Sequence, residues 1–182
     1  GVYLAPHGEG EENKVLLPGK QVPEGAKVGE ELEVFVYRDS KDRLIATCAQ
    51  PKLVMGQVAL LKVAQIGKIG AFLDWGLEKD LFLPFKQQTK RVKEGEEVLV
   101  SLYIDKSDRL CATMNVYQDL KKESPYKKDD EVTGRVYLIS HDFGAFVAVD
   151  DIYSALIPAK EMYGAVEAGA KVHARVTKVL ED

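Results

Sequence analysis

Apolar and polar residues alternate along this chain in short runs that end at turn residues. Val172, Ala174 and Val176 alternate with polar neighbours, which is the two-residue period of a half-buried strand. The segments 39–42 and 105–108, rich in Asp and Ser, lie between such runs and predict hairpin turns. A metal or acid/base site is the alternative for these carboxylates. No His or Glu, however, lies at a spacing in the sequence that would indicate such a site. The pattern predicts an all-β chain.

The same order of strands and turns recurs. Segment 93–113 repeats segment 27–47 at a constant spacing (93 − 27 = 66), and segment 144–147 matches segment 70–73 at a second spacing (144 − 70 = 74). A repeat of this length fixes the architecture. We expect three units, at residues 1–50, 51–118 and 119–182. Gly134 and Gly144 suit sharply coiled strands, so the sheets are expected to close into barrels.

The repeat spacing also predicts how the terminal units differ from the central one. The strand expected at 56–66 has no counterpart before Gly1, and the closing strand at 109–113 has none after Asp182. We therefore expect open barrels in the first and third units and a complete one between them. This registration also predicts that the natural protein continues beyond both ends, and that the open edges are covered by another copy or frayed.

Between the second and third units, Val116 and Leu120 share a helical face before Pro125, which predicts a short helical linker. Cys48 and Cys111 lie in apolar strand patterns and are expected to be free thiols, which points to the cytoplasm. No apolar run approaches the ~20 residues of a membrane span. The net charge of −4 argues against diffuse attraction to polyanions, so any contact with nucleic acid must be local.

The third unit carries a family resemblance. Segment 134–136, followed by 143–147, Leu156 and the turn at 167–172, resembles the ribosomal-protein S1 domain, a five-stranded OB barrel that binds RNA. The second unit matches less closely, with Ile69 at the position of the first aromatic residue, and the first unit is degenerate.

Three recurrences of Pro-x-Lys, beginning at Pro18, Pro84 and Pro158, are similar to the conserved virulence factor B or YitL-like family. That resemblance implies tandem S1 domains in an RNA-binding regulator with a C-terminal winged helix, for which this sequence has no segment. The usual S1 domain places a His where these prolines stand. This departure lowers the expected affinity for RNA.

The resemblance and the charge pattern together define candidate binding residues. Single-stranded nucleic acid is held by rings on which bases stack and by cations that meet phosphates. In the third unit the candidates are Phe143, Phe146, His141, Lys160 and Arg135. In the second unit they are Phe72, Trp75, Phe85 (or Phe82) and a basic loop of Lys86, Lys90, Arg91 and Lys93. For each ring the alternative is a place in the core, and for the loop it is a solvated surface.

These features predict a non-catalytic protein that binds single-stranded RNA and regulates gene expression. The alternative is a protein-interaction scaffold whose barrels have lost their RNA contacts. The acidic first unit, with Glu9, Glu11 and Glu12, is expected to contact protein. No nucleophile motif, phosphate loop or metal-ligand spacing is present, so we expect no enzyme activity, cofactor, metal, small-molecule substrate or membrane partner.

Overall fold

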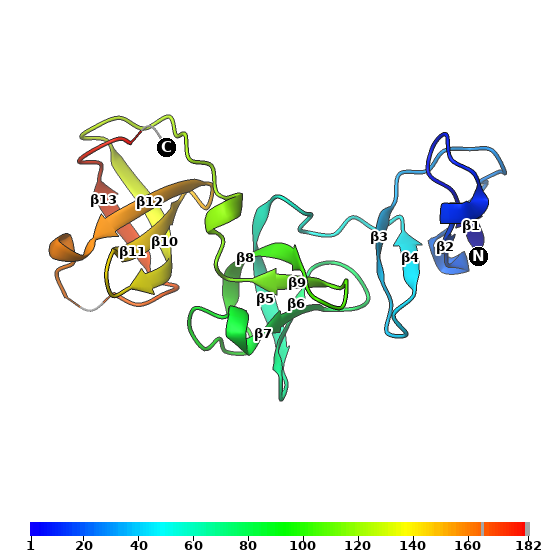
Figure 1. Ribbon diagram of the computed structural model, residues 1–182, viewed down its shortest axis with the longest axis horizontal. Helices are drawn as coiled ribbons and strands as arrows, with labels where there is room; N and C mark the ends of the chain where they lie inside the picture. The colour runs from blue at the N-terminus through cyan, green and yellow to red at the C-terminus, as the bar shows by residue number, and fades with distance from the viewer. Residues whose placement is uncertain (165, 181–182) are drawn as a thin grey trace.

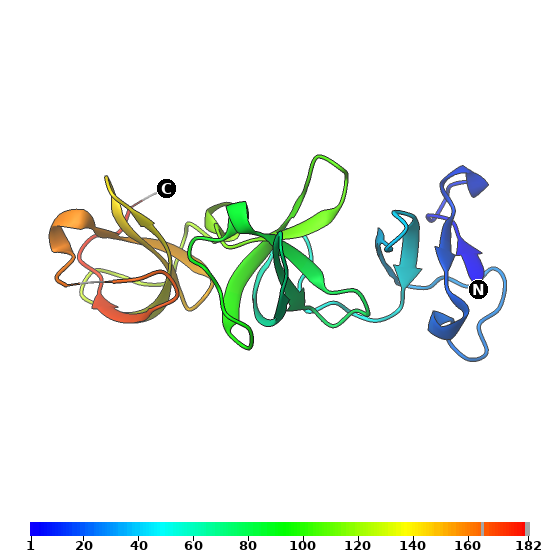
Figure 2. The same cartoon turned by 90° about the horizontal axis from the view of Figure 1, so that it is seen from below.

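The computed structural model describes residues 1–164 and 166–180. Over these residues the chain forms strands and short 3-10 turns without an α-helix, so the prediction of an all-β fold is confirmed. The strands make three sheets that follow one another along the long axis of the molecule (Figure 1), and the same row appears after a turn of 90° (Figure 2). The expected helical linker is a single 3-10 turn, η4 (Tyr117–Asp119).

The central sheet is nearly closed. Its strand order is β7-β6-β5-β8-β9. The strands are β5 (Val58–Ile66), β6 (Gly70–Asp74), β7 (Leu81–Pro84), β8 (Glu97–Ile104) and β9 (Leu110–Thr113). An irregularity in register after Val63 bends the long β5 so that it pairs with both β6 and β8. The Met114 N–H donates to the Gln87 carbonyl at 3.0 Å, which joins the ends of β9 and β7 around a core that includes Leu61 and Leu73.

The third sheet repeats this plan without a fifth strand among the described residues. Its order is β12-β11-β10-β13. The strands are β10 (Glu131–Ser140), β11 (Gly144–Val149), β12 (Tyr153–Pro158) and β13 (Lys171–Arg175). Gly144 has φ +123°, and a Cβ there would lie 2.0 Å from the Ile157 carbonyl oxygen, so only glycine allows this close strand approach. The register of β10 shifts after Val136, as that of β5 does after Val63.

The first sheet has the order β1-β2-β4-β3. Its strands are β1 (Val2–Leu4), β2 (Val15–Leu17), β3 (Phe35–Arg38) and β4 (Leu44–Thr47), and η1 (Glu11–Asn13) precedes β2. The strand β3 is shorter than β8, its counterpart in the repeat. In the central sheet the start of β8 pairs with β5, as Val98 does with Leu61. Among the described residues the first sheet has no counterpart of β5 with which a longer β3 could pair, and Val28, upstream of β3, is fully exposed.

The three sheets share a turn that contains a proline. The described strands number four, five and four in the three sheets in chain order, and the prediction of open terminal barrels stays a prediction. A proline follows β2, and a proline is the last residue of β7 and of β12; all three have φ near −58°, and each directly precedes a 3-10 turn. These turns are η2 (Gly19–Gln21), η3 (Phe85–Gln87) and η5 (Ala159–Glu161). The unit boundaries at 50 and 118 stay a prediction.

Both cysteines are free, as expected. Cys111 is buried on β9, and Cys48 is half-buried just after β4. Burial raises the pKa of the Cys111 thiol to about 11, and the nearby Asp105 carboxylate contributes to the rise. A thiol with that pKa is protonated and unreactive at neutral pH.

The outer faces of the central and third sheets pack together in a contact that we call the seam. Its buried residues come from β8, the linker, β10 and β11, and they are Leu99, Val116, Leu120, Tyr137 and Ala148. Burial raises the pKa of the Tyr137 hydroxyl to about 12, so this side chain is neutral at physiological pH. The seam therefore holds two sheets in one arrangement through apolar contact, with η4 beside it (Figure 1).

Leu99→Asp is expected to separate the two sheets. Leu99 is 4% exposed, so the variant places an unpaired carboxylate in an apolar contact, which costs several kcal/mol. The central core should survive, because Leu99 belongs to the seam and not to that core. Small-angle X-ray scattering should show a larger maximum dimension. Leu44→Asp, at a side chain that is 50% exposed, is the control. An unchanged scattering profile for Leu99→Asp would contradict the role of the seam.

Candidate functional site

Four of the five candidates in the third unit come together at one end of the third sheet. Phe143 lies in the turn between β10 and β11 with 63% of its surface exposed. Its ring centroid is 6.5 Å from that of Phe146, which is half-buried on β11. The Phe143 carbonyl accepts a 3.0 Å hydrogen bond from the Ala159 N–H, so the exposed Lys160 stands next to this turn. His141 is exposed in the turn itself.

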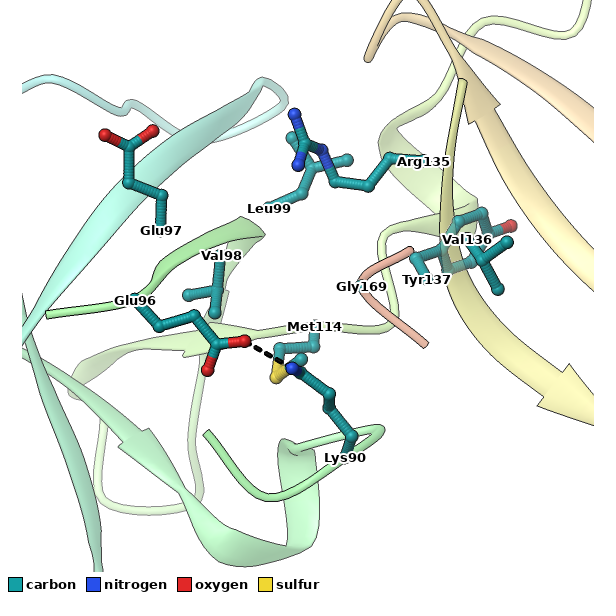
Figure 3. A pocket seen from close by; sticks show the side chains of 10 residues that line it. All are labelled: Lys90, Glu96, Glu97, Val98, Leu99, Met114, Arg135, Val136, Tyr137 and Gly169. Atoms are coloured by element: carbon teal, nitrogen blue, oxygen red, sulfur yellow. Dashed lines mark hydrogen bonds and ion pairs between the residues drawn. The ribbon is translucent and has the colours of Figure 1, made fainter. Parts of the chain in front are cut away.

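Arg135 is separate from this group. It lies on β10, where its Nε donates to an Asp151 carboxylate oxygen at 3.1 Å. Its side chain is only 17% exposed and lines a small pocket at the seam (Figure 3). The sequence prediction that Arg135 is a binding cation is therefore corrected. The partner of its guanidinium is the carboxylate of Asp151, in the acidic turn at residues 150–151.

The central sheet presents two aromatic groups. Phe72 and Phe82 are cross-strand partners on β6 and β7, with centroids 5.4 Å apart and both rings half-buried. In the loop after η3, the Arg91 guanidinium lies 4.2 Å from the centroid of the Phe85 ring. Lys86 is exposed in η3. The η3 turn and the loop after it thus combine the Phe85 ring with two exposed cations, Lys86 and Arg91.

Trp75 does not belong to the binding face, which corrects the sequence prediction. Its side chain is 3% exposed, and its indole N–H donates to the Lys79 carbonyl at 2.7 Å. Phe35 of the first sheet meets the ring edge-on, with centroids 5.6 Å apart. The first sheet covers this ring, and no signal in the local sequence around Trp75 predicts that.

Lys90 is occupied as well. It forms a partly buried ion pair with Glu96, and its Cε lies 3.1 Å from the position that a Cβ on Gly169 would take (Figure 3). Burial alone raises the pKa of Glu96, but bonds from Lys90 and from the Lys93 N–H outweigh it, and the pKa falls below its usual value. Lys90 therefore lines the small pocket beside the seam, next to Gly169 of the third unit. Lys86, Arg91 and Lys93 remain exposed cations of the predicted cluster.

Two linker residues join the third-sheet group, and sequence reasoning missed them. Tyr117, in η4, meets the Phe146 ring edge-on with centroids 6.2 Å apart and stays 42% exposed. The ammonium of Lys122 lies 5.0 Å from the centroid of the Tyr117 ring. The signal available in the sequence is an aromatic residue followed by two lysines in a linker.

The described residues show neither a group of three or more His, Cys, Asp or Glu side chains placed to hold a metal nor a helix able to cross a membrane. The candidate surface described above presents rings and cations, with the exposed carboxylates of Asp142 and Glu161 in the same turns. They suit stacking with flat rings and contact with anions.

Comparison with known proteins places this arrangement in a family. The profile of the S1 domain matches residues 1–49 and 55–115, and the chain belongs to that family. The third unit lies outside this match, although its residues show the motif most clearly and its strand order follows that of the central sheet.

The chain is also similar to individual proteins. It is 26% identical to the uncharacterized protein YitL of Bacillus subtilis and 25% identical to conserved virulence factor B of Staphylococcus haemolyticus, over 94% and 96% of its length. It spans 60% and 61% of those two relatives. A multidomain protein with nucleic acid binding domains from Streptococcus pneumoniae has the same fold, with a TM-score of 0.59 and 20% identity. The alignment covers 98% of this chain and 64% of that one.

Proposed function

We propose that this chain binds single-stranded RNA without catalysing a reaction, and that it regulates gene expression through that binding. The observation that carries the proposal is the ring pair Phe143 and Phe146 beside Lys160. An exposed ring stabilises an unpaired base by about 1 to 3 kcal/mol, and neighbouring cations meet the phosphates. Membership of the S1 family and similarity to a pneumococcal protein with nucleic acid binding domains support binding to nucleic acid.

The central sheet supplies the second part of the proposed interface. Lys86, Arg91 and Lys93 are exposed, and Arg91 already stacks on Phe85. Because the whole chain has a net charge of −4, attraction to phosphates depends on such local groups. The first sheet has three exposed carboxylates at Glu9, Glu11 and Glu12, which favour the second candidate function, a protein-binding scaffold, for that part of the chain.

Phe143→Ala is expected to weaken binding of a single-stranded oligouridine by about 1 to 3 kcal/mol, because one base loses its stacking surface. The fold should persist, since this ring is 63% exposed. Fluorescence anisotropy at fixed salt measures the effect. Tyr3→Ala, at an exposed ring of the first sheet, is the control and should change nothing. Equal affinities for wild type and a folded Phe143→Ala would rule out the ring as a stacking surface.

Arg91→Ala and Lys86→Ala should each flatten the plot of log affinity against log salt by about 0.7, the value for one phosphate contact on a single strand. Lys90→Met is the matched control, because Lys90 is paired with Glu96, and its slope should equal that of wild type. Titrations at three or more salt concentrations give the slopes. If Lys90→Met flattens the slope while the other two variants leave it unchanged, the assignment of cations is wrong.

A further inference from the structure

The linker is fixed to the edge of the third sheet. The Lys121 N–H donates to the Ile152 carbonyl, and the Ser154 N–H donates to the Lys121 carbonyl, each at 2.8 Å. Lys121 thereby forms a parallel bridge to Tyr153 at the start of β12. These bonds hold the adjacent Lys122 beside the sheet. The linker is therefore fixed to the third sheet and is not a free tether.

Below the surface, the linker is anchored by two apolar residues. Val116 is fully buried and Leu120 is 4% exposed, and both belong to the seam. Tyr117 lies between them in the chain, with 42% exposure. Anchoring by Val116 and Leu120 leaves the Tyr117 ring at the surface, where its edge meets Phe146. Tyr117 and Phe143 thus both contact Phe146, with centroid spacings of 6.2 and 6.5 Å, and the three make a cluster of rings together with the buried Tyr137.

We propose that Tyr117 and Lys122 form a nucleotide site that extends the Phe143 and Phe146 surface onto the linker, with Tyr117 held in place by the seam residues Val116 and Leu120 on either side of it. The ligand is an unpaired nucleobase with its phosphate. The inference rests on the proposed function, and it adds the linker as a binding element.

The Tyr117 ring binds a stacked base more strongly than it binds the ammonium of Lys122. A cation–π contact at an exposed site contributes about 0.5 to 1 kcal/mol, whereas a stacked base contributes about 1 to 3 kcal/mol. An incoming base therefore displaces the Lys122 ammonium from the ring. The displaced ammonium stays within reach of the phosphate of the same nucleotide.

The first sheet holds a natural comparison for this site. Lys14 lies 4.9 Å from the centroid of the Tyr3 ring, and Tyr3 is 65% exposed. The pair thus has the chemistry of Tyr117 and Lys122. Among the described residues, however, no ring pair includes Tyr3. Tyr3 and Lys14 consequently serve as matched controls that lack the cluster of rings.

Tyr117→Leu is the test, because leucine keeps the apolar contact with Phe146 and removes the aromatic face. Binding of a single-stranded oligouridine, followed by fluorescence anisotropy on the full chain, should weaken about 5-fold or more. Tyr3→Leu should bind like wild type. In a second pair, Lys122→Ala should flatten the salt dependence by about 0.7, and Lys14→Ala should not. Circular dichroism establishes that each variant is folded.

The outcomes separate this inference from the proposed function. If Phe143→Ala weakens binding while Tyr117→Leu and Lys122→Ala do not, the linker site is wrong and the proposed function stands. If neither Phe143→Ala nor the linker variants weaken binding, both are wrong. If Tyr3→Leu weakens binding as much as Tyr117→Leu does, any exposed tyrosine beside a lysine suffices, and the composite site is overturned.

Discussion

Apolar packing at the seam decides which surface this chain offers to a ligand. Leu99 on the outside of the central sheet meets Tyr137 and Ala148 on the outside of the third, with Val116 and Leu120 between them. Each fully buried aliphatic side chain contributes about 1.5 to 3 kcal/mol, so these contacts favour one docked arrangement over free rotation about a short linker. The docking buries part of the outer face of β11 and leaves the Phe143 end exposed. It also brings Tyr117 to Phe146. The proposed interface is thus a product of how the sheets pack as well as of each barrel's own motif.

The three prolines at the ends of β2, β7 and β12, of which Pro18 directly follows β2, explain how these barrels differ from the usual S1 pattern. Pro18, Pro84 and Pro158 fix the backbone at the point where the strand stops and a 3-10 turn begins. A ring that could bond to a base is therefore absent from each of these positions. The turns instead carry Lys20, Lys86 and Lys160. The second contributes an exposed cation next to Phe85, and the third contributes one next to Phe143. A rigid turn that presents a lysine thus stands where the usual S1 domain has its histidine.

The sequence predicts the strands and the repeats well, because these follow from local alternation and from spacing along the chain. It also proposes Phe143, Phe146 and Lys160 as parts of one surface, and in the structure they lie close together. It fails for Trp75, Lys90 and Arg135. Their partners are Phe35, Glu96 and Asp151, and Phe35 comes from a different sheet. It also misses Tyr117, whose place beside Phe146 depends on docking that no local pattern encodes.

Hydrogen–deuterium exchange of the full chain, with and without a single-stranded oligouridine, tests whether the ligand spans the linker and the third sheet. We expect slower exchange at backbone amides of residues 116–122, in the linker, and 141–146, at one end of the third sheet, with residues 1–30 unchanged. Protection in both segments at once would show that the ligand bridges the linker and the third sheet. Slower exchange confined to the first 50 residues, or none anywhere, would contradict an interface built on the docked seam.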